Sequence, residues 1–328
     1  MFKIINESYP NILSVTDILI GDMSDINYEF LLVDKPIILI SNAWLDKNFP
    51  DLGERISNIK QLHKTLLKIQ NIDNFVKNRD FYKKKAFFIY NNTNSKETLR
   101  KIIEFSNIDN PIISLHHNNN QIYKSNLLPL KKAAENMHLE VYENFSNSLP
   151  NIIHIAAHFA VLKNPSISND FCVHLDHGLK GDGTANVEIS LADYKKNNFF
   201  PNVDLHITAG PMGFERTKKL LGTNSDRAIQ GAYPKADYII NGNNNNNRYS
   251  ICKRYNLDPN LPIITYASAG EESLEKPGGS LSKEIIAELR NIHKLGGYNV
   301  VVKLKYKHYF IRRAFSKMKT KLKKLFPY

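Results

Sequence analysis

The sequence predicts an α/β protein with two Rossmann-like domains, and three observations support this fold class. Short apolar runs rich in Ile, Leu and Val recur along the chain, as is typical of buried parallel strands. Polar turns and helical patterns separate these runs, which is the alternation expected of βαβ units. The length of 328 residues suits about two domains of ordinary size.

A βαβ unit is easiest to recognise near the N-terminus. An apolar run at 17–20 predicts a strand, and a polar turn follows at 21–27. Residues 28–33 are expected to be helical, the Asp-Lys-Pro break at 34–36 ends this helix, and 37–40 form the next strand. In open α/β sheets, the loop after the carboxyl end of a strand is where phosphate-bearing ligands bind. The turn at 21–27 is therefore a candidate binding loop.

The rest of the first hundred residues is expected to close this domain. Apolar spacing predicts helices over 59–69, 75–85 and 96–105, with Ser95 as the N-cap of the last one. The first domain is therefore expected to span residues 1–106.

A second series of units follows. Strands are expected at 111–115, 139–142, 152–157, 171–175, 205–209 and 238–240, with a helix at 127–137. A last βαβ unit is expected from strand 263–267 through helix 281–294 to strand 298–304. We assign residues 107–260 to a second Rossmann-like domain. Residues 261–328 are expected to form the first βαβ unit of the nucleotide-binding domain and a basic tail.

The composition narrows the class of protein. A hydrophobic share of 42% and an aromatic share of 10% exclude wholesale disorder. No run approaches the roughly 18 apolar residues of a membrane-spanning helix, and the N-terminus lacks the apolar core of a signal peptide. Cys172 and Cys252 are too few for a disulfide framework. We therefore expect reduced thiols in a cytoplasmic protein.

The formal net charge of +12 is concentrated near the C-terminus. Ten Lys and Arg lie between Lys303 and Lys324 without an acid among them. Such a segment suits a polyanionic partner, and no nucleic-acid-binding motif accompanies it, so we expect no nucleic acid. Within 309–326, apolar residues fall roughly along one helical face. This pattern is typical of an interfacial helix on anionic lipid, although a basic face that handles a polyanionic substrate would look the same.

Several motifs then resemble one family. The binding loop reads Gly-Asp-Met-Ser-Asp at 21–25 and is followed by Asp-Lys-Pro-Ile-Ile at 34–38. These residues resemble the S/T-D-x-S-S loop and D-K-P-I-I strand of the CDP-glycerol glycerophosphotransferase family, with Asp25 at the place of the second serine. The resemblance continues at His177-Gly178 (the H-G loop), at 231–237 (G-Y-P-R-x-D), at 262–269 (P-x-I-x-Y-A-P-T) and at 301–304 (the K-L-H-P strand end). Lys305 stands where the family has the histidine of K-L-H-P.

The order of the motifs differs from that of the family. There the H-G half comes first, then K-L-H-P, then the D-x-S-S loop and the closing helices. Here residues 1–106 correspond to the closing part and precede the opening part at 107–328. Two explanations are open. The chain is either a circular permutation of one module or a segment of a tandem array, in which the end of one module is followed by the start of the next. We favour the tandem segment. Residues 1–106 and 107–328 can still fold together into one module within this chain, because chain termini tolerate relocation where they lie on the surface.

The resemblance implies a fold and an activity. It implies two domains of the GT-B type and transfer of glycerol phosphate, or a similar polyol phosphate, from a CDP-activated donor. The acceptor would be a polyanionic cell-surface polymer such as teichoic acid, and the enzyme would lie at the inner face of the membrane. No tightly bound cofactor is implied, since CDP-glycerol is the donor substrate. Two alternatives stay open: a GT-B glycosyltransferase that uses a nucleotide sugar, and a non-catalytic fragment.

His177, at a strand end in the H-G loop, is the expected general base. An imidazole with an ordinary pKa of about 6.5 can accept the proton of an acceptor hydroxyl at cytoplasmic pH. Asp176 would orient the ring, and Gly178 and Lys180 would contact phosphate. The alternative is a histidine that caps or packs a turn.

His308 is the expected second catalytic histidine, with Lys303 and Lys305 near it, or else it lies on a solvated basic face. The donor would contact the binding loop through Asp22, Ser24, Asp25 and Glu29. Of these, Glu29 would meet the ribose hydroxyls or lie on the helix surface. We expect no metal site, because the histidines at 116, 117, 154 and 158 lack a third ligand at metal-binding spacing and suit structural roles.

Overall fold

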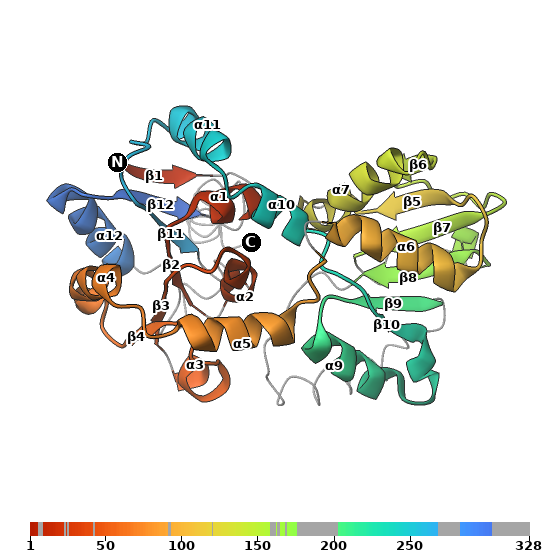
Figure 1. Ribbon diagram of the computed structural model, residues 1–328, viewed down its shortest axis with the longest axis horizontal. Coiled ribbons are helices and arrows are strands. Elements are labelled where there is room, and N and C mark those ends of the chain that lie inside the picture. The colour runs from red at the N-terminus through yellow and green to blue at the C-terminus, as the bar shows by residue number, and fades with distance from the viewer. Residues whose placement is uncertain are drawn as a thin grey trace, which may run out of the picture.

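The computed structural model describes residues 1–5, 9–22, 24, 26–41, 43–90, 93–119, 121–157, 162, 165–167, 169–175, 203–267 and 283–303. Within these ranges the chain forms two six-stranded parallel sheets, each in a domain with helices (Figure 1). This arrangement confirms the predicted α/β fold with two domains.

The first sheet is built from both ends of the chain. Its order is β1 (Phe2–Ile5), β12 (Asn299–Lys303), β11 (Ile263–Ala267), β2 (Ile18–Gly21), β3 (Ile37–Ile40) and β4 (Glu54–Ile56). All neighbouring strands are parallel, and Ile264 of β11 pairs with Ile18 of β2. The N-terminal and C-terminal segments therefore complete one sheet, as expected for two parts of one module.

Helices cover both faces of the first sheet because successive strand residues point to opposite sides. On one face lie α1 (Tyr9–Val15), α2 (Ile26–Phe30) with its 3₁₀ turn (Leu31–Val33), α10 (Ala236–Asn241) and α11 (Asn245–Tyr255). On the other face lie α4 (Leu62–Asn71), which follows a 3₁₀ turn (Ile59–Gln61), and α12 (Lys283–Leu295). Leu19 contributes to the first core, whereas Ile18 and Ile20 contribute to the second.

The second sheet has the order β10 (Ala228–Gln230), β9 (Leu205–Thr208), β8 (Phe171–Leu175), β7 (Ile152–Ala156), β5 (Ile112–His116) and β6 (Val141–Glu143). Helices α6 (Asn94–Ser106) and α7 (Gln121–Asn136) share an apolar core with this sheet, to which Leu99 and Leu127 contribute. Helix α9 (Pro211–Leu221) follows β9 and leads through a 3₁₀ segment (Gly222–Arg227) to β10.

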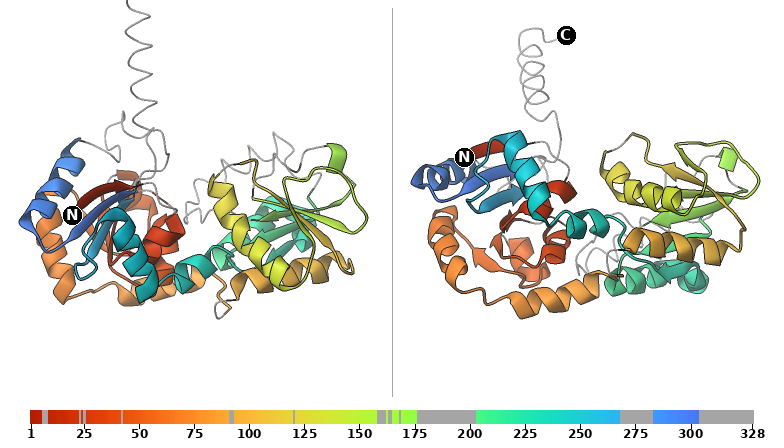
Figure 2. Two further views of the ribbon diagram at one scale, coloured as in Figure 1. Left: turned by 90° about the horizontal axis from the view of Figure 1, so that it is seen from above. Right: turned by 45° about the horizontal axis from the view of Figure 1, so that its top comes forward.

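Within the described ranges, the chain crosses between the two domains twice. Helix α5 (Val76–Ala86) follows α4, which the chain reaches through α3 (Ala43–Asn48) and β4. It ends beside the second domain and leads into α6, and the segment after β10 returns through α10 (Figures 1 and 2). The first domain was expected to reach residue 106, but α6 packs on the second sheet, so the structure places this helix with the second domain. The reason is the apolar face of α6, where Leu99 and Ile102 are fully buried.

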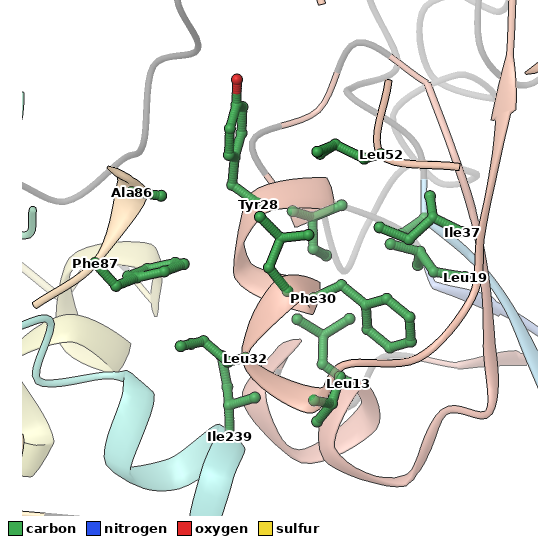
Figure 3. Close-up of a cluster of buried hydrophobic side chains, with 14 of the residues drawn as sticks. Leu13, Leu19, Tyr28, Phe30, Leu32, Ile37, Leu52, Ala86, Phe87 and Ile239 are labelled. Carbon is green, nitrogen blue, oxygen red and sulfur yellow. The ribbon is translucent and has the colours of Figure 1, made fainter. Parts of the chain in front are cut away.

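A shared apolar core joins the domains around helix α2 (Figure 3). It contains Leu13, Leu19 and Phe30 of the first domain together with Phe87 and Ala209. The ring of Phe87 lies 5.5 Å from that of Tyr233, between centroids. The two domains are therefore in direct apolar contact beside the strand ends.

Two local predictions were wrong. Residues 238–240 were expected to form a strand, but they lie in helix α10, and the edge strand is Ala228–Gln230 instead. A three-residue apolar run cannot distinguish a strand from a buried helix, and here Ile239 is buried in the interdomain core. Ser95 was expected to cap α6, but it lies inside the helix, which begins at Asn94.

In the part of the chain that the structure describes, no helix has both the length and the apolar character needed to cross a membrane.

Candidate functional site

The carboxyl ends of four neighbouring strands meet at one edge of the first sheet. Ile5 pairs with Lys303, Lys303 with Ala267, and Ala267 with Gly21, so the last residues of β1, β12, β11 and β2 lie in one row. Because the strands are parallel, the loops that follow them leave the sheet on the same side. This edge is where open α/β sheets bind ligands.

The candidate binding loop begins at this edge with Asp22, whose side chain is 5% exposed. The amide Nδ2 of Asn27 donates to the backbone oxygen of Asp22 at 2.6 Å. The oxygen of Ser24 accepts from the backbone N–H of Asn27 at 3.1 Å, and its Oγ accepts from the N–H of Ile26 at 3.4 Å. Helix α2 thus follows the strand almost at once, and the partly exposed Ser24 lies in the turn between them.

Gly21 makes this close turn possible. A Cβ at Gly21 would lie 1.8 Å from Oδ1 of Asn27, so no other residue fits without a shift. The side chain of Asn27 fills the space that the glycine leaves and ties α2 to the loop. The binding loop and the first turn of α2 therefore form one packed unit.

Lys303 is the last residue of β12 and is 4% exposed. One strand, β11, separates it from Gly21. The structure therefore brings the predicted site residues Asp22, Ser24 and Lys303 to the same edge, although Lys303 and the loop lie at opposite ends of the sequence. A carboxylate, a hydroxyl and an ammonium group can together contact a polar, phosphate-bearing ligand.

Glu29 has a different environment from the one expected. It is 6% exposed, which excludes the alternative of a helix-surface acid. Its Oε1 accepts from the Nζ of Lys235 at 2.7 Å and from the hydroxyl of Tyr233 at 2.8 Å. Sequence reasoning missed Lys235 as a partner, because no local pattern connects residues 206 positions apart.

The remaining predicted site residues lie outside the described ranges. These are Asp25, His177, Gly178, Lys180, Lys305 and His308. The basic segment 309–326 and Asp176 also lie outside the described part of the chain.

The second sheet has one apolar face and one polar face. Ile113, Ile153 and Val173 point to the core under α6 and α7, so the alternating residues point to the other side. The alternating residues include the apolar Ile152 and Ala156, but most are polar or sulfur-bearing, and all are buried: Ser114, His116, His154, Cys172, His174, His206 and Thr208. A doubly wound sheet is usually apolar on both faces, so this polar face is unusual.

Hydrogen bonds connect several of these polar groups. Nε2 of His116 lies 2.9 Å from Nδ1 of His154, and Nε2 of His154 lies 3.1 Å from Oδ2 of Asp170. Because His154 donates to the carboxylate through Nε2, its Nδ1 is the acceptor for the N–H of His116. Ser114 donates to the oxygen of Phe145 at 2.8 Å, so its hydroxyl is not a free nucleophile.

Burial favours the neutral form of His116, His154 and His206 by lowering the pKa of each. It lowers the pKa of His116 to about 4, with a contribution from His154, and it lowers the pKa of His206 to about 3, with a contribution from Arg227. Burial also raises the pKa of the Cys172 thiol to about 12. The described part of the chain contains no group of His, Cys, Asp and Glu side chains that could hold a metal ion. On this face, His116, His154 and Asp170 form a buried hydrogen-bonded network.

Asp237, in the segment that resembles G-Y-P-R-x-D, binds the start of α6. Its Oδ1 accepts from the backbone and side-chain amides of Asn94, at 3.0 and 2.8 Å, and its Oδ2 accepts from the N–H and hydroxyl of Ser95, at 2.8 and 2.5 Å. A carboxylate suits the unpaired N–H groups at a helix start. Asp237 therefore anchors α10 to α6 and has no free oxygen for a substrate.

Comparisons with known proteins give little similarity. No family model matches the chain, and no curated protein matches it. Among solved structures, the chain is similar to a glutamate racemase from Francisella tularensis subsp. tularensis SCHU S4 in complex with D-glutamate. The identity is 12%, the match covers 88% of this chain and 97% of that chain, and the TM-score is 0.22. A TM-score this low does not support a shared fold.

Proposed function

We propose that the chain transfers glycerol phosphate, or a similar polyol phosphate, from a CDP-activated donor to a polyanionic cell-surface polymer. In this proposal the two α/β domains are arranged as in the GT-B type, and the donor nucleotide binds at the carboxyl edge of the first sheet. The polymer acceptor and an anionic membrane surface at the cytoplasmic side are the proposed partners.

One observation carries the proposal. Two sequence motifs resemble the donor-binding parts of glycerophosphotransferases, and their residues Asp22 and Lys303 are 281 positions apart in the sequence. Both motifs nevertheless lie at the same edge of one sheet. A single α/β ligand site uses loops from this edge. The placement therefore supports a joint role for the two motifs in binding one ligand.

The reaction needs a nucleophile, a base and charge stabilisation. The oxygen of an acceptor hydroxyl forms a bond to the glycerol-bearing phosphorus of the donor. The bond between that phosphorus and the bridging oxygen of the diphosphate breaks, and CMP leaves. The hydroxyl proton passes to the base, for which we propose His177 on the basis of the sequence.

Positive charge at the sheet edge would stabilise the leaving phosphate. Lys303 is the described residue suited to this role, since an ammonium group near a diphosphate offsets the charge that develops on departure. Lys305, Lys180 and His308 are proposed to add to it. Ser24 and Asp22 would fix the position of the nucleotide, with Asp25 and Gly178 in the neighbouring loops.

The test is release of CMP from CDP-glycerol in the presence of a glycerol-phosphate polymer. We expect release that depends on the acceptor, and we expect His177→Ala to slow it by roughly 10²–10⁴-fold. Lys77→Ala, on the exposed side of α5, is the control and should leave the rate unchanged. Release from a UDP-sugar but not from CDP-glycerol would favour a glycosyltransferase. No release from either donor, in a folded protein, would favour a non-catalytic fragment.

A further inference from the structure

We propose that Lys235 is a positioning residue: by binding Glu29 it fixes helix α2 and, through α2, the loop that carries Asp22 and Ser24. Lys235 belongs to the segment that returns from the second sheet. The contact would therefore make the shape of the candidate site in the first domain depend on the second domain. The structural part of this inference stands alone, whereas its effect on nucleotide binding rests on the proposed function.

The contact is short and buried. Nζ of Lys235 donates to Oε1 of Glu29 at 2.7 Å, and the hydroxyl of Tyr233 donates to the same oxygen at 2.8 Å. Lys235 is 5% exposed and Glu29 is 6% exposed. A buried carboxylate and a buried ammonium group are each unfavourable without a partner. Each of the two side chains therefore restricts the position of the other.

Among the described residues, Oε2 of Glu29 has no hydrogen-bond partner. The hydrogen bonding of the carboxylate within this part of the chain therefore depends on Oε1 alone. Loss of the Lys235 ammonium would leave a buried charge with the Tyr233 hydroxyl as its remaining donor there. We expect Glu29 to move toward water in that case, because unpaired buried charge is unfavourable.

Helix α2 transmits such a movement to the binding loop. It has only five residues, Ile26–Phe30, and all are buried, so tertiary contacts rather than helix propensity hold it in place. On the same helix, Asn27 donates to the Asp22 oxygen at 2.6 Å and packs against Gly21. A shift of Glu29 therefore displaces the groups that shape the loop.

The other side of the contact is firmly attached to the second domain. The backbone N–H of Ala232 donates to Oγ1 of Thr98 on α6 at 3.1 Å. The N–H of Gly231 donates to the oxygen of Thr208, at the end of β9, at 3.0 Å. Tyr233 packs on Phe87. The contiguous set of contacts from Thr208 to Asp22 is the physical basis for coupling between the domains.

Hydrogen exchange of the full chain tests the structural part without any ligand. In Lys235→Met we expect the amides of residues 26–33 to exchange at least about tenfold faster than in the wild type, because local opening becomes easier. Lys235→Arg keeps the charge and should restore most of the protection. The matched control is Arg248→Met, which removes an ion pair with Asp17, at 2.8 Å, near the amino end of β2. It should leave exchange at 26–33 close to that of the wild type.

A titration with CDP then tests the functional part. We expect Lys235→Met to weaken CDP binding by about fivefold or more, a usual size for coupling between sites, while Arg248→Met does not. Wild-type exchange at 26–33 in Lys235→Met would overturn the positioning role, whatever CDP does. If CDP does not bind the wild type, the proposed donor is wrong, and exchange still decides the role of Lys235. If Lys235→Met does not fold, Tyr233→Phe takes its place, because it removes the other donor to Oε1 of Glu29. We expect it to speed exchange at 26–33 by less than the roughly tenfold expected for Lys235→Met, and wild-type exchange there would overturn the inference.

Discussion

The hydroxyl oxygens of Thr16 and Thr265 lie 2.6 Å apart in the buried interior, although 249 residues separate them in the sequence. Thr16 donates its own proton to the backbone oxygen of Ile12 at 2.7 Å, so Thr265 is the donor between the two hydroxyls. The pair connects the segment before β2 to the middle of β11. It is one of the polar contacts that hold the two ends of the chain in one sheet.

A double-mutant cycle should detect this contact. We expect Thr16→Val and Thr265→Val each to lower the free energy of unfolding by about 1–2 kcal/mol. Thr16→Val leaves the buried Thr265 hydroxyl without this acceptor, and Thr265→Val removes one of the hydrogen bonds of the Thr16 hydroxyl. The double variant should lose clearly less than the sum, as for residues in contact. Urea unfolding provides the three values. Thr16→Val combined with Thr208→Val, in the second sheet, is the control and should be additive.

Additive losses in the Thr16 and Thr265 cycle would show that the two hydroxyls do not interact. The pairing of β11 with β2 would then hold these segments together without a contribution from this contact.

Gly21 is the second point at which a single change should have a large effect. We expect Gly21→Ala to lower the free energy of unfolding by about 1–3 kcal/mol, the usual effect of overpacking, because the added Cβ would meet Oδ1 of Asn27 at 1.8 Å. Gly296→Asn is the comparison. At Gly296 the backbone has a φ of +83°, where asparagine is less strained than most non-glycine residues, and a Cβ added there would have no atom within 4 Å. An equal loss in the two variants would argue against the close turn at Gly21.

Acid should destabilise the protein through the polar face of the second sheet. Burial lowers the pKa of His116 to about 4 and that of His206 to about 3, whereas both titrate near 6.5 when unfolded. The unfolded state therefore binds more protons below pH 6.5, and stability falls as the pH drops from about 6.5 toward 4. Thermal unfolding across this range is the measurement. His206→Gln removes one titrating group and should make the decline shallower, whereas an unchanged slope would rule out a contribution from His206.

The sequence could predict the strand–helix alternation of both domains because buried parallel strands are apolar runs. Phe171–Leu175 and Ile263–Ala267 are strands at the expected residues. The union of the two chain ends was also predictable, since the Asp22 loop and the Lys303 strand resemble parts of one module. Shorter apolar runs did not predict the correct secondary structure. The three apolar residues at 238–240 gave no period long enough to reveal helix α10.

Contacts between distant residues could not be predicted. Lys235 belongs to a segment that resembles a loop motif, and its partner Glu29 is determined by the packing of α2 against that segment. The buried network of His116, His154 and Asp170 depends on the register of β5 against β7, which a single sequence does not reveal. The same holds for α6, whose apolar face packs on the second sheet although the helix follows the first domain in the sequence.

Binding of the donor tests the central claim most directly. Isothermal titration of the full chain with CDP-glycerol, and separately with UDP-glucose, measures which nucleotide the carboxyl edge of the first sheet accepts. We expect CDP-glycerol to bind at least about tenfold more tightly, a difference of about 1.4 kcal/mol, and Lys303→Met to remove most of that binding in a protein that still unfolds cooperatively. Equal or tighter binding of UDP-glucose, or CDP-glycerol binding that Lys303→Met leaves unchanged, would contradict it.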